Sequence, residues 1–94
     1  MDKKHEDYLG ELRKQINGLD YQLINIISQR TNIVQEVGDY KKTHNLEVYQ
    51  PGREKELYAA RRGLAEDASL NPDMIEGLFK LIVEESKRLQ REKK

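Results

Sequence analysis

The sequence predicts an all-α fold: one domain over residues 1–94 built from three helices, the first of them very long. Two observations predict it. Apolar residues recur at steps of three and four from Leu9 to Tyr40, which is the spacing of a helix face or a heptad repeat. Pro51 and Pro72 each stand where a new helix would begin. We find no internal repeat or low-complexity tract.

The first helix is expected over about residues 7–42. At 1.5 Å per residue it would be about 50 Å long, which exceeds the width of a compact domain of this size. Gly10, Gly18 and Gly38 each weaken it by up to about 1 kcal/mol relative to alanine, so packing has to stabilise it. Its apolar repeat runs through Leu9, Leu12, Ile16, Leu19, Leu23, Ile26, then Arg30, then Ile33, Val37 and Tyr40.

A loop, "THNLEVYQPG", interrupts the helical period, and Val48 and Tyr49 are expected to be extended ahead of Pro51. The second helix, "PGREKELYAARRGLAED", is short and poor in apolar residues. Its inner side is expected to carry Leu57, Ala60 or Arg61, and Leu64.

The third helix has the clearest start signal. Asn71 suits the N-cap, Pro72 the first helical position, and Asp73 the positive end of the helix dipole. The helix is expected to run to about residue 91. Its inner face includes Ile75, Leu78, Phe79, Ile82 and Val83.

Composition limits the classes of function. With 36% hydrophobic and 36% charged residues, the chain has little apolar material for a core, so a partner would have to supply the rest. Lys+Arg and Asp+Glu both number 17, and no excess of positive charge calls for nucleic acid or an anionic membrane. The absence of cysteine removes disulfides and thiolate chemistry. It also makes a reducing cytoplasm the compartment we expect. Because the N-terminus has no apolar run, we expect a soluble protein without a signal peptide or membrane span.

Polar side chains stand where the helices should be apolar. Arg30 interrupts the heptad repeat. Val37 and Lys41 follow it by seven and eleven residues, separations that bring a helix to within about 20° of two and three whole turns. All three side chains therefore lie on one stripe of the helix. Such a stripe places two cations on the side of the helix that should be buried.

The other two helices show the same anomaly. Ser86 and Gln90 follow Ile82 at steps of four, so both polar side chains continue the apolar stripe of the third helix. Arg53 and Glu54 open the second helix just after its proline. These groups could converge with the first helix on one pocket.

Each residue taken singly also has a structural explanation. An arginine in a heptad repeat can set the register or extend to the rim, and a lysine near a helix C-terminus compensates the dipole. Fraying would explain polar residues at the end of the third helix, and exposure would explain charges in a first turn. The pocket hypothesis depends on their coincidence.

A pocket of this composition suits a small dianion. Arginine offers a planar fork for a carboxylate, lysine a compact charge, and glutamine a neutral donor. No nucleophile and base pair is evident, and His5 and His44 fit solvated surface positions rather than metal ligands. Chemistry there would have to work by shape and charge.

The chain resembles the all-helical chorismate mutases from about Leu12 to Gln90. The resemblance rests on four motifs in order: "LRKQINGLDYQLINIISQR", "EVGDYK", "VYQPGREKEL" and "LFKLIVEESKRLQ". The segment "LEVYQPGREKEL" looks especially like mutase modules that are fused to prephenate dehydrogenase.

The resemblance implies a dimer that converts chorismate to prephenate by a Claisen rearrangement, in the biosynthesis of phenylalanine and tyrosine, without a cofactor or metal. It implies that Arg30 and Arg13 bind the two substrate carboxylates, with Arg13 supplied by the other subunit. Lys41 and Gln90 would donate to the ether oxygen, and Glu54 would hold the ring hydroxyl.

The resemblance also implies that Arg53, Ser86, and the neighbourhood of Val37 and Gln50 complete the pocket. One departure is visible, because Gln50 stands where close relatives often have aspartate. If that position acts through its backbone N–H, the change matters little.

The residue roles that the resemblance implies, taken together with the spacing along the first helix, predict an intertwined homodimer. Arg13 and Lys41 are 28 residues apart, which is about 42 Å along a straight helix, so one small substrate cannot touch both in the same chain. If Arg13 comes from an antiparallel partner helix, the twofold axis crosses near residues 23–24. Each of the two sites would then use both chains.

Three other functions remain open at this point. An isochorismate-pyruvate lyase would share the fold and the cationic pocket, although Glu54 favours the mutase because it suits the ring hydroxyl. A helical dimerisation module would use Arg30 only to set the register. The third possibility is a mutase domain that regulates another enzyme of the same pathway, to which it binds non-covalently.

Overall fold

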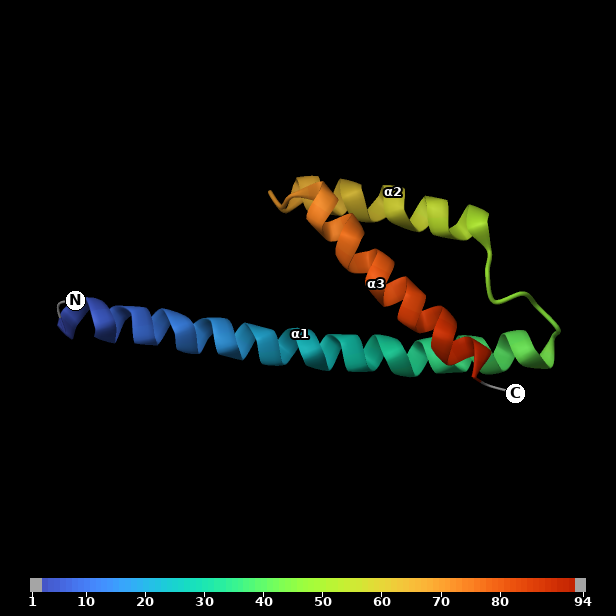
Figure 1. Cartoon of the computed structure of the whole chain (residues 1–94), viewed down its shortest axis with the longest axis horizontal. Coiled ribbons are helices and arrows are strands. Elements are labelled where there is room, and N and C mark those ends of the chain that lie inside the picture. The colour runs from blue at the N-terminus through green and yellow to red at the C-terminus, as the bar shows by residue number, and fades with distance from the viewer. Residues whose placement is uncertain (1–2, 93–94) are drawn as a thin grey trace. The chain divides into compact units, whose positions relative to one another are not determined.

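The computed structural model describes residues 3–92, which form three helices joined by two short connections (Figure 1). The helices are α1 (Lys3–Thr43), α2 (Pro51–Asp67) and α3 (Pro72–Arg91). The predicted all-α class is confirmed, and the bounds agree with the sequence-based ones except that α1 begins a turn earlier. The chain divides into two compact units, Met1–Asn32 and Ile33–Lys94. No helix within residues 3–92 has the length and apolarity needed to span a membrane.

The first unit exposes the apolar repeat of α1. Ile16, Leu19, Leu23 and Ile26 have exposed fractions of 54%, 62%, 50% and 61%. Within Lys3–Thr43 only Gly38, which belongs to the second unit, is buried. A helix in a protein gains most of its stability from packing of its apolar face, and an isolated helix is only marginally stable in water. The described chain alone therefore leaves this face uncovered.

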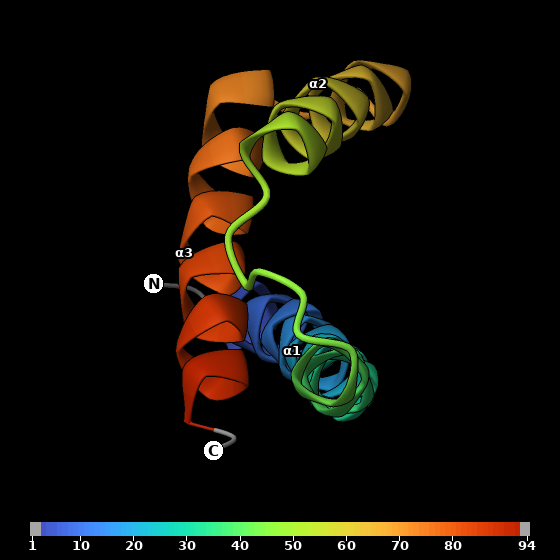
Figure 2. The ribbon, with the colours of Figure 1, turned by 90° about the vertical axis from the view of Figure 1, so that its right-hand side faces the viewer.

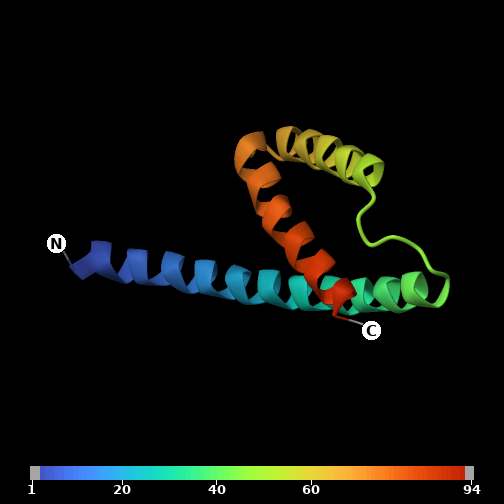
Figure 3. The same ribbon diagram turned by 45° about the vertical axis from the view of Figure 1, so that its right-hand side comes forward.

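The second unit contains the last turns of α1 together with α2 and α3. Helices α2 and α3 meet at the turn after Asp67 and diverge toward their other ends (Figures 1 and 3). The core residues are Leu57 and Ala65 of α2 and Val83 of α3. Because few apolar residues fill the space where α2 and α3 diverge, long polar side chains such as Lys87 and Glu54 bridge the two helices there.

One sequence-based assignment in α2 is wrong. Leu64 was expected on the inner side, but it is 59% exposed, and its neighbour Ala65 is buried with 2% exposed. The close approach of α2 and α3 near their connecting turn favours a small residue on the buried side. Leu57 is buried as expected, with 6% exposed, so the buried stripe of α2 runs from Leu57 to Ala65 in two steps of four residues.

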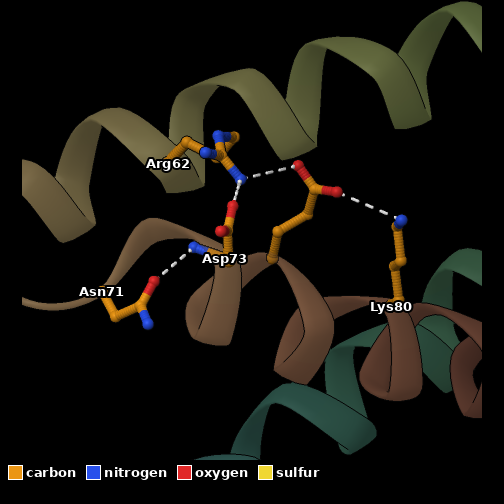
Figure 4. Close-up of polar contacts among 5 residues, drawn as sticks. Arg62, Asn71, Asp73 and Lys80 are labelled. Atoms are coloured by element: carbon orange, nitrogen blue, oxygen red, sulfur yellow. Dashed lines mark hydrogen bonds and ion pairs between the residues drawn. The ribbon is translucent and has the colours of Figure 1, made fainter.

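The turn between α2 and α3 is fixed by polar contacts (Figure 4). The Asn71 side chain accepts a hydrogen bond from the backbone N–H of Asp73 at 2.9 Å, which confirms the predicted N-cap. Arg62 of α2 pairs with Asp73 at 2.9 Å and with Glu76 at 3.3 Å, and Lys80 pairs with Glu76 at 3.1 Å. These pairs are partly exposed, so they orient the turn more than they stabilise it.

The C-terminal end of α3 crosses the last turns of α1 (Figure 1), and the two helices lie side by side there when viewed along α1 (Figure 2). The contact is between Gln90 and Gly38: a Cβ atom added to Gly38 would lie 3.3 Å from the Gln90 Cα atom. Helix α3 runs to Arg91, so Gln90 lies inside its last turn. This crossing brings the polar end of α3 to the C-terminal end of α1.

Candidate active site

Lys41 extends from the last turns of α1 over the loop that follows. Its Nζ donates a hydrogen bond to the carbonyl oxygen of Val48 at 3.1 Å, and the residue is half-buried. Burial lowers the pKa of the Lys41 ammonium, and the nearby negative charge of Glu54 opposes that effect. Lys41 is thus turned toward α2, instead of only compensating the dipole of its own helix.

Glu54 lies in the first turn of α2 and pairs with a buried lysine of α3. The Lys87 Nζ is 3.3 Å from Glu54 Oε1 and 3.2 Å from Glu54 Oε2, and the two side chains are 11% and 18% exposed. Lys87 also pairs with Glu84 at 2.8 Å, and its Nζ lies 4.8 Å from the centre of the Tyr49 ring. The hydrogen bond with Glu84 is the main cause that raises the pKa of Lys87.

Lys87 was not among the residues predicted from the sequence. A signal was present, because Lys87 directly follows Ser86 and precedes Gln90 by three residues, so it lies one helical turn from a residue that was assigned to the site. Its partner on α2 could not be identified from spacing. The charge of Glu54 is therefore compensated by a residue to which no role was assigned.

Gln90 is buried, with 9% exposed, and its amide oxygen has no hydrogen-bond partner within residues 3–92. Leaving a buried polar atom unpaired typically costs about 1–3 kcal/mol, so such an atom calls for an explanation. The oxygen and nitrogen of an amide exchange places by rotation of its last torsion. Gln90 can therefore offer a hydrogen bond to a ligand from a position that is otherwise buried.

Ser86 is also buried, and its hydroxyl donates to the backbone oxygen of Ile82 at 2.8 Å. A hydroxyl that donates to its own helix retains lone pairs that can accept a hydrogen bond. The fraying interpretation of Ser86 and Gln90 is wrong, because both lie inside α3 and are buried.

We call the following five residues the polar cluster: Lys41, Glu54, Ser86, Lys87 and Gln90. The charges of the first two interact, Lys87 pairs with Glu54, and Gln90 contacts Gly38, which is one turn before Lys41. The cluster draws on α1, α2 and α3 within the second unit. The polar cluster thus contains two cations, one carboxylate and two neutral hydrogen-bonding groups, drawn from three helices.

The other predicted site residues are placed differently. Val37, Gln50 and Arg53 belong to the second unit and are exposed. Arg13, which is exposed, and Arg30, which is half-buried, belong to the first unit. Their participation in one site with the polar cluster stays a prediction.

Two further features bear on what the cluster could bind. Within residues 3–92, no group of three histidine, aspartate or glutamate side chains is arranged to hold a metal ion. An apolar groove of about 310 Å³ lies at the α2–α3 turn, away from the polar cluster. It is lined by Arg61, Leu64, Ala65, Ala68, Leu70, Ile75 and Phe79. Its mostly apolar lining does not suit a dianion.

Replacing a helical glycine by alanine normally raises the free energy of unfolding, but we expect no such gain at Gly38. An added Cβ would lie 3.2 Å from Gln90 Cγ and 3.3 Å from Gln90 Cα, so the helices would have to separate slightly. Gly77 of α3 has open space and serves as the control. In urea unfolding at one protein concentration, Gly77→Ala should gain about 1 kcal/mol and Gly38→Ala should not. An equal gain in both variants would contradict the close crossing.

Comparisons with known proteins agree on one family. The family model described as chorismate mutase type II matches residues 12–91. The T-protein of Enterobacter agglomerans is 37% identical over 78 residues, which cover 83% of this chain and 21% of that protein. A chorismate mutase of Methanocaldococcus jannaschii is 26% identical over 84 residues, which cover 89% of this chain and 85% of that protein.

A further relative carries a different substrate in its name. The 4-amino-4-deoxychorismate mutase of Streptomyces pristinaespiralis is 29% identical over 86 residues, which cover 92% of this chain and 67% of that protein. The chain spans about a fifth of the length of the T-protein it matches. Because the family model covers most of the sequence, the chain belongs to the chorismate mutase type II family.

Proposed function

We propose that the chain is a chorismate mutase that rearranges chorismate to prephenate in the biosynthesis of phenylalanine and tyrosine. Family membership over residues 12–91 supports this reaction. The observation that carries the proposal is the polar cluster, in which Lys41, Glu54 and Gln90 are wholly or partly buried together. The cytoplasm is the compartment we propose, since the sequence has no cysteine and its chemistry needs no export.

The reaction suits a pocket without a nucleophile. In the rearrangement an ether C–O bond breaks while a C–C bond forms, no proton moves, and no covalent intermediate with the protein is needed. Acceleration must therefore come from holding the reactive conformation and from stabilising the charge that develops on the ether oxygen. Lys41 and Gln90 would donate to this oxygen, and Glu54 would accept from the ring hydroxyl.

Arginines would hold the ends of the substrate. Arg30 and Arg13 would each form a forked pair with one carboxylate, and Arg53, Ser86, Val37 and Gln50 would complete the wall. Positions 28 residues apart on a straight helix are about 42 Å apart, so Arg13 would have to come from a second copy of the chain. The exposed apolar repeat of α1 supports such a homodimer. Residues 1–94 would then act as one domain of that dimer.

The direct test offers purified protein three substrates in separate assays: chorismate, isochorismate and 4-amino-4-deoxychorismate. The name of the Streptomyces relative makes the amino compound the second candidate substrate. We expect prephenate from chorismate as the main product. Pyruvate and salicylate from isochorismate would identify a lyase instead. A protein that turns over none of them, and whose melting temperature is unchanged by chorismate, would be a dimerisation module.

The pH dependence should report Lys41. Because burial lowers its pKa below the ordinary 10.5, kcat/KM with chorismate should fall on the alkaline side with an apparent pKa below that value. We expect a fall at high pH because deprotonation leaves a neutral amine, which stabilises the developing negative charge on the ether oxygen less than the ammonium does. In Lys41→Arg, whose guanidinium does not titrate there, this limb should move to higher pH. An alkaline limb at the same pH in both proteins would assign it to another group.

A further inference from the structure

Lys87 is a mostly buried cation that the proposed reaction leaves without a role. Its Nζ lies within 3.3 Å of both oxygens of Glu54, the residue assigned to the ring hydroxyl. Glu84 and the Tyr49 ring contact the same ammonium from other directions. An ammonium that has three partners from α2, α3 and the connecting loop is fixed in position, so its charge acts at a defined place.

Of the two carboxylates that pair with Lys87, only Glu54 is largely buried. The Glu84 side chain is 66% exposed, so water and salt screen its charge, whereas Glu54 and Lys87 are 18% and 11% exposed. The negative charge of Glu54 is therefore compensated mainly by the Lys87 ammonium, and Lys41 is a second cation nearby. A carboxylate with such a partner still has lone pairs for a neutral donor.

We propose that Lys87 makes this end of the pocket selective for a neutral hydroxyl over a protonated amine. The inference rests on the proposed function, in which Glu54 binds the substituent of the substrate ring. A hydroxyl can donate to Glu54 whether or not Lys87 is present. A protonated amine brings another cation to roughly 5 Å from Lys87, and at an effective dielectric constant of about 20 this repulsion corresponds to a factor on the order of 10² in affinity.

The repulsion identifies Lys87 as a specificity residue, which acts on the bound substituent through its charge while it pairs with Glu54. Without it, the buried carboxylate would attract an amine more than a hydroxyl, because charge-assisted pairs are stronger than neutral hydrogen bonds. The signature of this role is a change in the ratio of two substrates. A merely structural role would lower the rates with both substrates together.

Matched variants on α3 isolate the effect. Lys87→Met removes the charge and keeps an unbranched side chain, and Lys87→Arg keeps the charge. Lys80→Met is the control, because Lys80 is also on α3 and pairs with Glu76 at 3.1 Å (Figure 4). Its Nζ also lies 6.0 Å from the centre of the Tyr58 ring. Its ion-pair partner Glu76 lies outside the polar cluster, whereas the Tyr58 ring lies within reach of the charges of Glu54 and Lys87. Lys80→Met therefore also controls for any effect that is transmitted through this ring.

The experiment measures kcat/KM for chorismate and for 4-amino-4-deoxychorismate and compares their ratio among the variants. Lys87→Met should lower the chorismate preference by about 10- to 100-fold, while Lys87→Arg and Lys80→Met should stay within about 3-fold of the native ratio. Lys87→Gln should give the same shift as Lys87→Met, and it replaces that variant if the methionine reduces helicity.

Two outcomes would overturn the inference, and they can be told apart. If the native protein rearranges chorismate but Lys87→Met keeps the native ratio, Lys87 has no part in selectivity while the proposed function stands. If the native protein rearranges neither substrate, the proposed function fails, and the inference fails with it.

Discussion

Lys41→Ala is expected to lower kcat for chorismate by on the order of 10² to 10³, the usual effect of losing one preorganised donor to a developing oxyanion. The half-buried ammonium is held by the Val48 carbonyl and faces the charge of Glu54, so it is oriented before the substrate binds. On the proposed mechanism, an alanine would leave the ether oxygen with Gln90 as its remaining donor. Because the interaction strengthens in the transition state, kcat should fall more than KM rises.

The neighbouring Lys42 provides the control for this prediction. Lys42 lies in the same last turn of α1 and is exposed, so Lys42→Ala should keep native activity. Gln90→Ala should show a loss in kcat like that of Lys41→Ala. Circular dichroism at the assay concentration separates catalysis from folding. A loss of helicity in Lys41→Ala that parallels the loss of activity would indicate a structural role instead.

Arg30→Ala is expected to raise KM strongly and to lower kcat/KM by on the order of 10² or more, since truncating one partner of a desolvated charge pair typically costs at least about 2–5 kcal/mol. The guanidinium would bind a substrate carboxylate already in the ground state, which is why KM responds. Arg13→Ala should give the same pattern. Steady-state kinetics with chorismate measures both constants.

Lys14 is the control for the arginine variants. It lies next to Arg13 on α1, is exposed, and forms only a surface pair with Glu11 at 3.4 Å. Lys14→Ala should therefore leave KM within about 2-fold of the native value. If Arg13→Ala behaved like Lys14→Ala, the carboxylate role of Arg13 would be refuted.

The helices could be predicted because their ends carry local chemical signals. Pro51 begins α2, and Asn71 caps α3 with the predicted hydrogen bond to Asp73. Such signals act within a few residues of each other and need no knowledge of tertiary packing. The apolar repeat of α1 also depends only on residues three and four positions apart, so this long helix could be predicted as well.

Features that depend on helix rotation could not be predicted. Helix α2 has few apolar residues, so its rotation is set by packing on α3, and Ala65 rather than Leu64 became the buried residue. The pairing of Lys87 with Glu54 joins positions 33 residues apart and depends on the same rotation. The close approach of Gln90 to Gly38 likewise follows from a helix crossing that no local pattern encodes.

The central claim is that one pocket is built from two chains and rearranges chorismate. The most direct test mixes inactive Arg13→Ala subunits with inactive Arg30→Ala subunits and assays prephenate formation after exchange. Each heterodimer would regain one intact site, so an equal mixture should recover about a quarter of the native activity. No recovery, with heterodimers demonstrated by mass spectrometry, would contradict the shared site.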